Sequence, residues 1–214
     1  MIMNFKYGTK EIEYLKSKDP VLGAAIDEIG HLERSVNPDM FGSLVNAIVG
    51  QQISMKAQET IWLRMLEKFD PMTAEAINKA SAEDLQSCGI SFRKAEYIKE
   101  IALSVTSGDL DLDGLHTMSD NDVCKRLSQI KGIGVWTAEM LMTFSMQRPD
   151  IMSFDDLAIL RGLRMLYHHR KITKELFSKY KRRYSPYATV ASLYLWAIAS
   201  GACPSLKDYS PKPK

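Results

Sequence analysis

Residues 127–140 read LSQIKGIGVWTAEM, and this stretch decides how the chain folds. Gly132 and Gly134 are one residue apart and lie between two segments with the apolar spacing of helices. Glycine adopts backbone angles that other residues resist, so the pair predicts a tight hairpin between two helices. The second helix would begin with backbone N–H groups that have no partner within the helix. Such a helix start suits an anion, and a nucleic-acid phosphate is an obvious candidate.

The hairpin pattern has two interpretations. An ordinary corner between packed helices would use the same glycines. The fuller pattern L-x-x-I-K-G-I-G-x-x-T-A favours a phosphate-binding hairpin, in which Ile130 and Ile133 anchor the turn and Ala138 keeps the helices close. Hairpins of this type contact phosphates without reading bases, so the motif alone indicates DNA binding and no chemistry. Residues 85–95, LQSCGISFRKA, are a weaker echo, either a degenerate second hairpin or a plain helix–turn–helix unit.

The composition is that of an ordinary folded protein, with 214 residues, 45% apolar, 25% charged and a net charge of +2. This length suits one sizeable domain or two small lobes. The weak positive charge neither demands nor excludes a nucleic acid, although basic residues gather over 168–171 and 179–183. Three separated cysteines without metal-ligand spacing indicate reduced thiols. We see no signal peptide, and the longest apolar stretch, 187–203, is short for a membrane span, so we expect a cytoplasmic protein with no membrane partner.

Helical spacing recurs along the chain, and no segment shows the sustained alternation of a strand. We therefore predict an all-α fold of roughly ten helices. Ser81 and Ser119 each stand three residues before an acidic residue, which is close to the capping-box pattern of a helix start. Ser185-Pro186 predicts the start of the last helix, and Gly201 predicts its end.

Four blocks, in this order and spacing, resemble the helix–hairpin–helix DNA glycosylases, and most of all their 3-methyladenine DNA glycosylase II-like (alkylpurine) branch. The blocks cover residues 47–54, 132–138, 154–159 and 185–196. The resemblance implies a two-lobed helical fold with a cleft between the lobes and without the N-terminal β domain of larger relatives. The central lobe would span residues 41–149, and the N-terminal helices of residues 1–40 would pack with a C-terminal lobe of residues 150–214.

The resemblance places the essential aspartate of the family at Asp156, at the start of the C-terminal lobe, and leaves Asp155 as a helix cap beside the base pocket. Breaking an N-glycosidic bond develops positive charge on the sugar, which a carboxylate stabilises while it orients or deprotonates the attacking water. An alkylated purine such as 3-methyladenine or 7-methylguanine already carries positive charge, so it leaves without a second acid. Relatives that also cut the strand through a Schiff base carry a lysine at the position of Trp136. We therefore predict a monofunctional hydrolase that leaves an abasic site.

The target nucleotide must leave the duplex to be reached. The resemblance implies that Trp136 and Trp196 stack on the extruded base, although both tryptophans would also suit a core. An indole face attracts a cationic base by roughly 0.5–2 kcal/mol. Met140 stands where some relatives carry a tyrosine, which would make this pocket less polar. Gln52 takes the position of the wedge that fills the gap in the duplex, and Gln51 beside it would contact the DNA backbone or the opposite strand.

The resemblance also assigns roles to the hairpin. The residues that would face the DNA phosphates are Lys131, Gly132, Ile133, Gly134, Val135 and Thr137. Members of the family bind a monovalent cation through backbone carbonyls, and here those of Ser128, Ile130 and Ile133 would hold Na⁺ or K⁺. We expect no required cofactor. The iron–sulfur cluster of some relatives needs four cysteines near the C-terminus, where this chain has only Cys203.

We expect the partner to be double-stranded DNA with damaged bases and the protein to be a monomer, working at the nucleoid in a prokaryote or in the nucleus of a eukaryote. Two alternatives remain open. The same fold would also serve an enzyme for a mismatched, deaminated or oxidised base. A non-catalytic DNA-binding module would use the hairpin alone, and the position of Asp156 argues against it.

Overall fold

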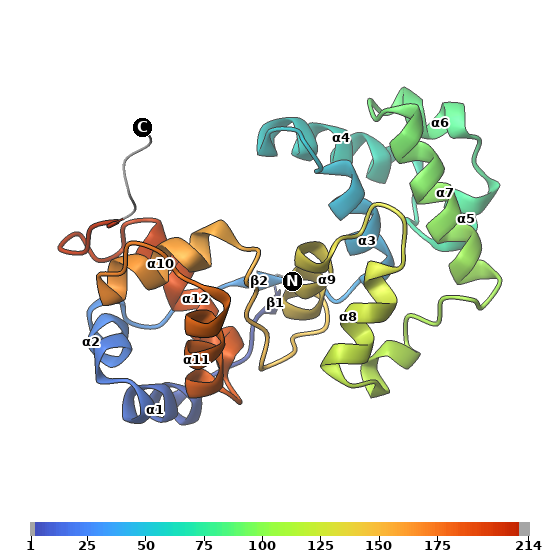
Figure 1. Cartoon of the computed structure of the whole chain (residues 1–214). Helices are drawn as coiled ribbons and strands as arrows, with labels where there is room; N and C mark the ends of the chain where they lie inside the picture. The colour runs from blue at the N-terminus through green and yellow to red at the C-terminus, as the bar shows by residue number, and fades with distance from the viewer. Residues whose placement is uncertain (1–2, 210–214) are drawn as a thin grey trace. The chain divides into compact units, whose positions relative to one another are not determined.

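The computed structural model describes residues 3–209, and helices make up most of this range (Figure 1). Twelve α-helices over the described residues confirm the all-α prediction. Within the same range, no helix has both the length and the apolar character needed to cross a lipid bilayer. In chain order the elements are β1 (Met3–Asn4), α1 (Thr9–Lys18), α2 (Pro20–Ile29), β2 (Ser35–Val36), α3 (Met40–Val49), α4 (Met55–Lys68), α5 (Ala74–Lys79), α6 (Ala82–Ser87), α7 (Phe92–Thr106), the 3₁₀ helix η1 (Gly114–Thr117), α8 (Asp120–Ser128), α9 (Val135–Phe144), α10 (Leu157–Tyr167), α11 (Lys174–Tyr184) and α12 (Ala188–Ala199).

Within residues 3–209, a short β-ladder departs from the predicted all-helical fold. β1 pairs with β2 in antiparallel orientation, with Met3 opposite Val36 and Asn4 opposite Ser35. Strands of two residues are too short to show the alternation by which a strand is predicted.

The chain divides into two compact units. The first, here called the terminal unit, falls within Met1–Val36 and Met142–Lys214, and the second, the central unit, is Asn37–Leu141. The lobe boundaries predicted from the sequence, after residues 40 and 149, lie somewhat later in the chain than the observed ones. The second observed boundary falls inside α9.

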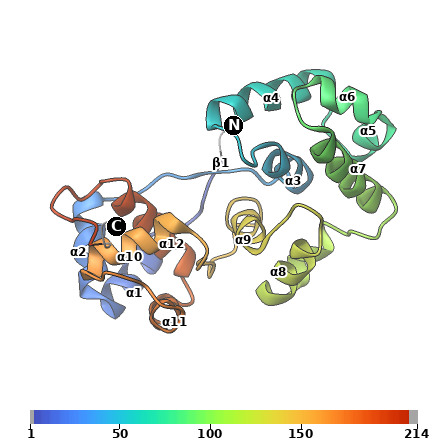
Figure 2. The ribbon, with the colours of Figure 1, turned by 45° about the horizontal axis from the view of Figure 1, so that its top comes forward.

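The terminal unit is built on close packing between α10 and α12, which lie side by side in Figures 1 and 2. Gly162 makes this packing possible, because a β-carbon at that position would collide with the backbone carbonyl oxygen of Leu195. Tyr184 and Tyr194 are fully buried in the same core. α1 and α2 complete the unit through contacts with α11 and α12.

A buried carboxylate joins three helices of the terminal unit. Asp19 is only 1% exposed and caps α2 by accepting the N–H groups of Val21 and Leu22, each at 3.1 Å. Its Oδ2 also accepts hydrogen bonds from the hydroxyl of Tyr167 at 2.7 Å and from the guanidinium of Arg183 at 2.5 Å. These donors satisfy the buried charge, so that α2, α10 and α11 are held together at one point.

The start of α12 differs from its prediction. The sequence placed it at Ser185-Pro186, whereas the helix begins at Ala188. Asp150 supplies the cap: its Oδ1 accepts the N–H of Ala188 at 3.1 Å and its Oδ2 accepts the hydroxyl of Ser185 at 2.6 Å. Ser185 therefore binds the capping group instead of capping the helix itself.

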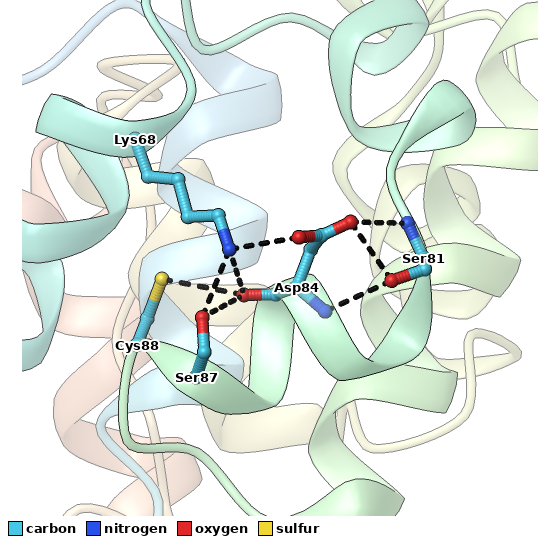
Figure 3. Close-up of polar contacts among 5 residues, drawn as sticks. All are labelled: Lys68, Ser81, Asp84, Ser87 and Cys88. Carbon is cyan, nitrogen blue, oxygen red and sulfur yellow. Dashed lines mark hydrogen bonds and ion pairs between the residues drawn. The ribbon is translucent and has the colours of Figure 1, made fainter.

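In the central unit, a polar cluster links α4 to α6 (Figure 3). The predicted capping box is confirmed, since Ser81 Oγ accepts the N–H of Asp84 at 3.0 Å and Asp84 Oδ2 accepts the N–H of Ser81 at 3.1 Å. Lys68 of α4 donates to Asp84 Oδ1 and to Ser87 Oγ, both at 2.9 Å. The hydrogen bond from Lys68, with those from Ser81, lowers the pKa of Asp84 to about 2. The predicted helix start at Ser119 is also confirmed.

Candidate functional site

The turn between α8 and α9, residues 129–134, uses its two glycines for different reasons. Gly132 has φ +85, and a β-carbon there would lie 2.8 Å from Ile48 Cδ1 and 2.8 Å from Tyr97 Cδ2. A β-carbon on Gly134 would have no atom within 4 Å. The fold therefore requires glycine at position 132, while Gly134 leaves open space in front of the hairpin.

The start of α9 is exposed and bears no capping side chain of its own. Ala138 donates its N–H to the carbonyl of Gly134 at 2.9 Å, which makes Gly134 the N-cap, and glycine has no side chain to accept the next N–H groups. Ile133 and Ala138 are buried, at 3% and 0% exposure, as the motif predicts, whereas Ile130, the other predicted anchor, is only half-buried. Val135 and Trp136 are 47% and 46% exposed. Trp136 is thus a surface indole at the helix start and not a core residue, and Thr137 and Met140 follow it in half-buried positions.

Lys131 is exposed, but it has a protein partner. Its Nζ lies 2.7 Å from Glu100 Oε1 of α7, and this hydrogen bond raises the pKa of Lys131. Solvent-exposed pairs of this kind contribute little stability, because water and salt screen them. A phosphate at the hairpin would therefore meet a lysine that is easily drawn away from Glu100.

The predicted wedge lies in the turn between α3 and α4, which belongs to the central unit like the hairpin. Gln52 is exposed and has φ +58, a left-handed conformation that is uncommon for residues other than glycine. The Gln51 side chain donates from Nε2 to the carbonyl of Gly132 at 2.5 Å. In the structure the Gln51 amide thus engages the hairpin, where the sequence analysis expected it to contact DNA.

Asp156 is the N-cap of α10 in the terminal unit. It is 7% exposed, and its Oδ1 accepts the N–H groups of Ala158 and Ile159, each at 2.9 Å. The assignment of the cap to Asp155 is therefore wrong: Asp155 is exposed and stands one position too early to reach these amides. The contacts hold the Asp156 carboxylate in one orientation at the start of a helix, where negative charge is favourable.

Trp196 lies on α12 within an aromatic stack of the terminal unit. Its ring stacks on Phe144, with centroids 5.5 Å apart and an interplanar angle of 29°, and the guanidinium of Arg34 lies 5.2 Å from the Phe144 centroid. Trp196, Arg34 and Ser200 line one cavity of about 160 Å³. Trp196 is therefore half-buried, packed on Phe144 and at the edge of this cavity.

The residues predicted to hold a cation are hairpin residues with oxygen atoms suited to a hard ion. The carbonyl of Ile130 accepts the N–H of Ile133 at 3.0 Å, and a carbonyl oxygen has a second lone pair for another partner. The hydroxyl of Ser128 is buried and makes no hydrogen bond within the described chain. Among residues 3–209 there is no group of three or more His, Cys, Asp and Glu side chains that could hold a metal ion.

Two polar side chains that the sequence analysis missed contact the predicted site. Glu100 pairs with Lys131, and Lys94 donates to the backbone of the Gln51 turn. Both residues lie on α7. Glu100 is more than 30 residues from Lys131 along the chain, and Lys94 is more than 40 residues from Gln51. Their spacing from these partners carries no local signal, and the only hint is that α7 belongs to the echo of the hairpin.

Comparison with known proteins places this geometry in a family. Residues 45–186 match the model of the HhH-GPD superfamily base excision DNA repair proteins. DNA-3-methyladenine glycosylase 1 of Schizosaccharomyces pombe is 37% identical over 175 residues, which cover 79% of this chain and 75% of that protein.

Two solved structures agree with this match. The crystal structure of a DNA-3-methyladenine glycosidase from Bacillus halodurans superposes with a TM-score of 0.87 and 34% identity, covering 98% of this chain and 97% of the other. A 3-methyladenine DNA glycosylase of S. pombe in complex with abasic DNA gives a TM-score of 0.74 and 31% identity over 90% of this chain and 97% of the other. This chain belongs to the HhH-GPD superfamily of base excision DNA repair proteins, among its DNA-3-methyladenine glycosylases.

Proposed function

We propose that this protein is a monofunctional DNA glycosylase that hydrolyses the N-glycosidic bond of alkylated purines in double-stranded DNA, 3-methyladenine and 7-methylguanine among them. The observation that carries the proposal is the carboxylate of Asp156, nearly buried and oriented by two backbone N–H groups at the start of α10. It lies in the third of the four blocks that resemble the family. The relatives named above carry the same activity in their names.

Asp156 supplies a fixed negative charge beside the reacting bond, which bulk water does not provide. As the bond between sugar and base breaks, positive charge grows on the sugar, and a fixed carboxylate stabilises that charge without having to reorganise. The same group orients the attacking water or accepts its proton. An alkylated purine leaves with the electron pair of the bond and becomes neutral, so the leaving base needs no proton.

The residue at the start of α9 supports hydrolysis without strand cleavage. A Schiff-base mechanism needs an amine, and position 136 holds an indole that cannot form one. Trp136, Trp196, Met140 and Asp155 are the residues proposed to contact the extruded base. An indole face favours a cationic base over a neutral one.

The hairpin is the proposed grip on the DNA backbone. The amides that follow Gly134 and the ammonium of Lys131 suit phosphate oxygens, and the open space at Gly134 admits them. Na⁺ or K⁺ on the carbonyls of Ser128, Ile130 and Ile133 would bridge the turn and a phosphate. Hydrolysis itself needs no cofactor and no iron–sulfur cluster. We propose that the protein acts as a monomer wherever the cell keeps its DNA.

The test is release of free base from methylated duplex DNA, compared between the wild type, Asp156→Asn and Asp39→Asn. Asparagine keeps the helix cap and removes only the charge, so Asp156→Asn should fold normally and lose roughly 10²–10³-fold in rate. Asp39 caps α3 through the N–H of Gly42 at 2.9 Å, so Asp39→Asn is the matched control and should keep full activity. Treatment with borohydride should trap no covalent complex with DNA.

Other outcomes would overturn the proposal in defined ways. DNA binding without release of any base would indicate a non-catalytic module. Release of only deaminated or oxidised bases would keep the chemistry and change the lesion. Equal activity of Asp156→Asn and the wild type would remove the assigned role of the carboxylate.

A further inference from the structure

The turn that carries Gln52 holds a backbone conformation that needs support. It joins Val49 at the end of α3 to Met55 at the start of α4. Gln52, with φ +58, sits in a region of backbone space that side chains other than glycine rarely adopt. Such a conformation persists only where surrounding contacts determine it.

Lys94 of α7 supplies such contacts. Its Nζ donates to the carbonyl of Val49 at 2.8 Å and to the carbonyl of Gln51 at 2.7 Å, so a single ammonium joins the end of α3 to the turn. The last carbonyls of a helix have no partner within the helix, and a cation is favourable at that end. Lys94 is half-buried, and burial lowers its pKa.

Side chains hold the segment at two further points. Gln51 donates to the carbonyl of Gly132 at 2.5 Å, which ties the turn to the hairpin. Gln58 of α4 donates to the carbonyl of Asn46 in α3 at 3.1 Å. The backbone on the N-terminal side of Gln52 is thus fixed to α4, α7 and the hairpin, while Gln52 itself is exposed.

We propose that Lys94 is a positioning residue for base extrusion: it fixes the carbonyls before Gln52 so that this side chain keeps the orientation in which it fills the gap in the duplex. The inference rests on the proposed function and assigns that function a new residue. A side chain that enters a base stack is pushed back by the bases, and a turn without its anchor yields to that push. Lys94 therefore acts through Gln52 and the protein backbone and not as a phosphate contact.

The same helix offers a matched control. Lys99 of α7 donates from Nζ to the carbonyl of Asn78 at 2.7 Å, to that of Ile77 at 3.3 Å, and to that of Ala80. It thus holds the end of α5 as Lys94 holds the end of α3. Replacing either lysine by methionine removes the same kind of contact, and only one of the two supports the Gln52 turn.

The experiment measures single-turnover excision of 7-methylguanine by Lys94→Met, Lys99→Met, Gln52→Ala and the double variant Lys94→Met/Gln52→Ala, with thermal melting of each. We expect Lys94→Met to slow excision roughly tenfold or more, since hydrogen bonds to a charged group are strong. Lys99→Met should melt earlier but excise at the wild-type rate. The double variant should be no slower than Gln52→Ala alone, and Lys94→Arg should restore part of the rate. Lys94→Gln replaces the methionine variant if that does not fold.

A second measurement separates this proposal from the proposed function. Binding to a duplex with a tetrahydrofuran abasic analogue opposite 2-aminopurine reports by fluorescence whether a side chain fills the gap, and it requires no excision. The wild type and Lys99→Met should give the signal, and Gln52→Ala and Lys94→Met should lose it. If the wild type gives the signal but releases no base, the proposed function is overturned and the role of Lys94 in positioning Gln52 is not. A full fluorescence signal from Lys94→Met would overturn the role of Lys94. So would an excision rate in the double variant that is reduced by the product of the two single-variant reductions.

Discussion

The central unit contains two helix–turn–helix segments that differ in one decisive place. α6–α7 and α8–α9 both turn at a glycine with positive φ, Gly89 at +109 and Gly132 at +85. The second helix of the first segment is capped by Ser91, whose Oγ accepts the N–H of Lys94 at 3.4 Å. The second helix of the other segment, α9, begins at Val135, and its N-cap Gly134 has no capping atom to offer. One segment therefore caps its second helix with its own side chain, whereas residue 134, at the start of the other second helix, has no side chain with which to cap it.

The surroundings of the two turn glycines also differ. A β-carbon on Gly89 would meet nothing nearer than Ile61 Cγ1 at 3.4 Å, an ordinary contact, whereas one on Gly132 would meet Ile48 and Tyr97 at 2.8 Å. The hairpin turn is thus pressed against the core, and the α6–α7 turn is not. A count of glycines does not distinguish a packing corner from the hairpin proposed to bind phosphate, whereas the residue at the start of the second helix differs between the two segments.

The largest expected contrast comes from replacing the turn glycines by alanine. Gly132→Ala combines a disfavoured left-handed backbone with a collision against the side chains of buried Ile48 and half-buried Tyr97, so it should lower the free energy of unfolding by about 3 kcal/mol. Gly89→Ala meets only the backbone penalty and should lower it by about 1 kcal/mol. Urea denaturation of both variants measures the contrast. Equal losses would mean that Gly132 is under no special packing constraint.

A smaller effect is expected when the two helix starts are exchanged. Gly134→Ser gives α9 a capping hydroxyl and fills the space proposed for a phosphate, so affinity for duplex DNA should fall roughly tenfold while the fold is kept. Ser91→Gly uncaps α7 and should lower stability by only a few tenths of a kcal/mol, with DNA affinity unchanged. Fluorescence anisotropy across a salt titration measures both variants. An equal loss of affinity in Ser91→Gly would show that the α6–α7 segment also grips DNA.

The smallest expected effect is a loss of stability at acid pH, and it arises from Asp84 in the α6–α7 segment. Asp84 has its pKa lowered from 3.8 to about 2, mainly by the hydrogen bond from Lys68. Because the folded value is the lower one, its contribution to stability is complete above the unfolded pKa and is lost as pH falls through about 2. Amide chemical shifts of Ser81 and Asp84, followed by NMR during acid titration, should show this transition, and Asp84→Asn should abolish it. A midpoint near 3.8 would mean that the contact with Lys68 does not persist in solution.

Sequence predicted the local features of this fold and missed those made by distant partners. The helix starts at Ser81 and Ser119 were predictable because cap and partner lie three residues apart. The start of α12 was misplaced because its cap, Asp150, lies 38 residues before Ala188. The cap of α10 was placed one residue early because Asp155 and Asp156 fit the same pattern, and only the path of the backbone separates them.

The candidate site divides in the same way. The hairpin and the position of Asp156 could be predicted because their spacing along the chain resembles a known family. The contacts of Lys94 and Gln51 could not, since each joins a side chain to a backbone carbonyl more than 40 residues away. Every residue has the same backbone carbonyl oxygen. The pattern of residue types therefore does not reveal which carbonyl accepts a hydrogen bond from a given lysine.

The absence of a side chain at Gly162 has a consequence for how the enzyme would discriminate between bases. Asp156 caps the start of α10 and α12 carries Trp196, and the two helices pack so closely at Gly162 that no β-carbon fits between them. Closely packed interiors resist compression, so the packing of α10 against α12 at Gly162 resists any shift of the two helices. With the roles proposed for Asp156 and Trp196, a purine of the wrong width would gain little from a shift of these two helices.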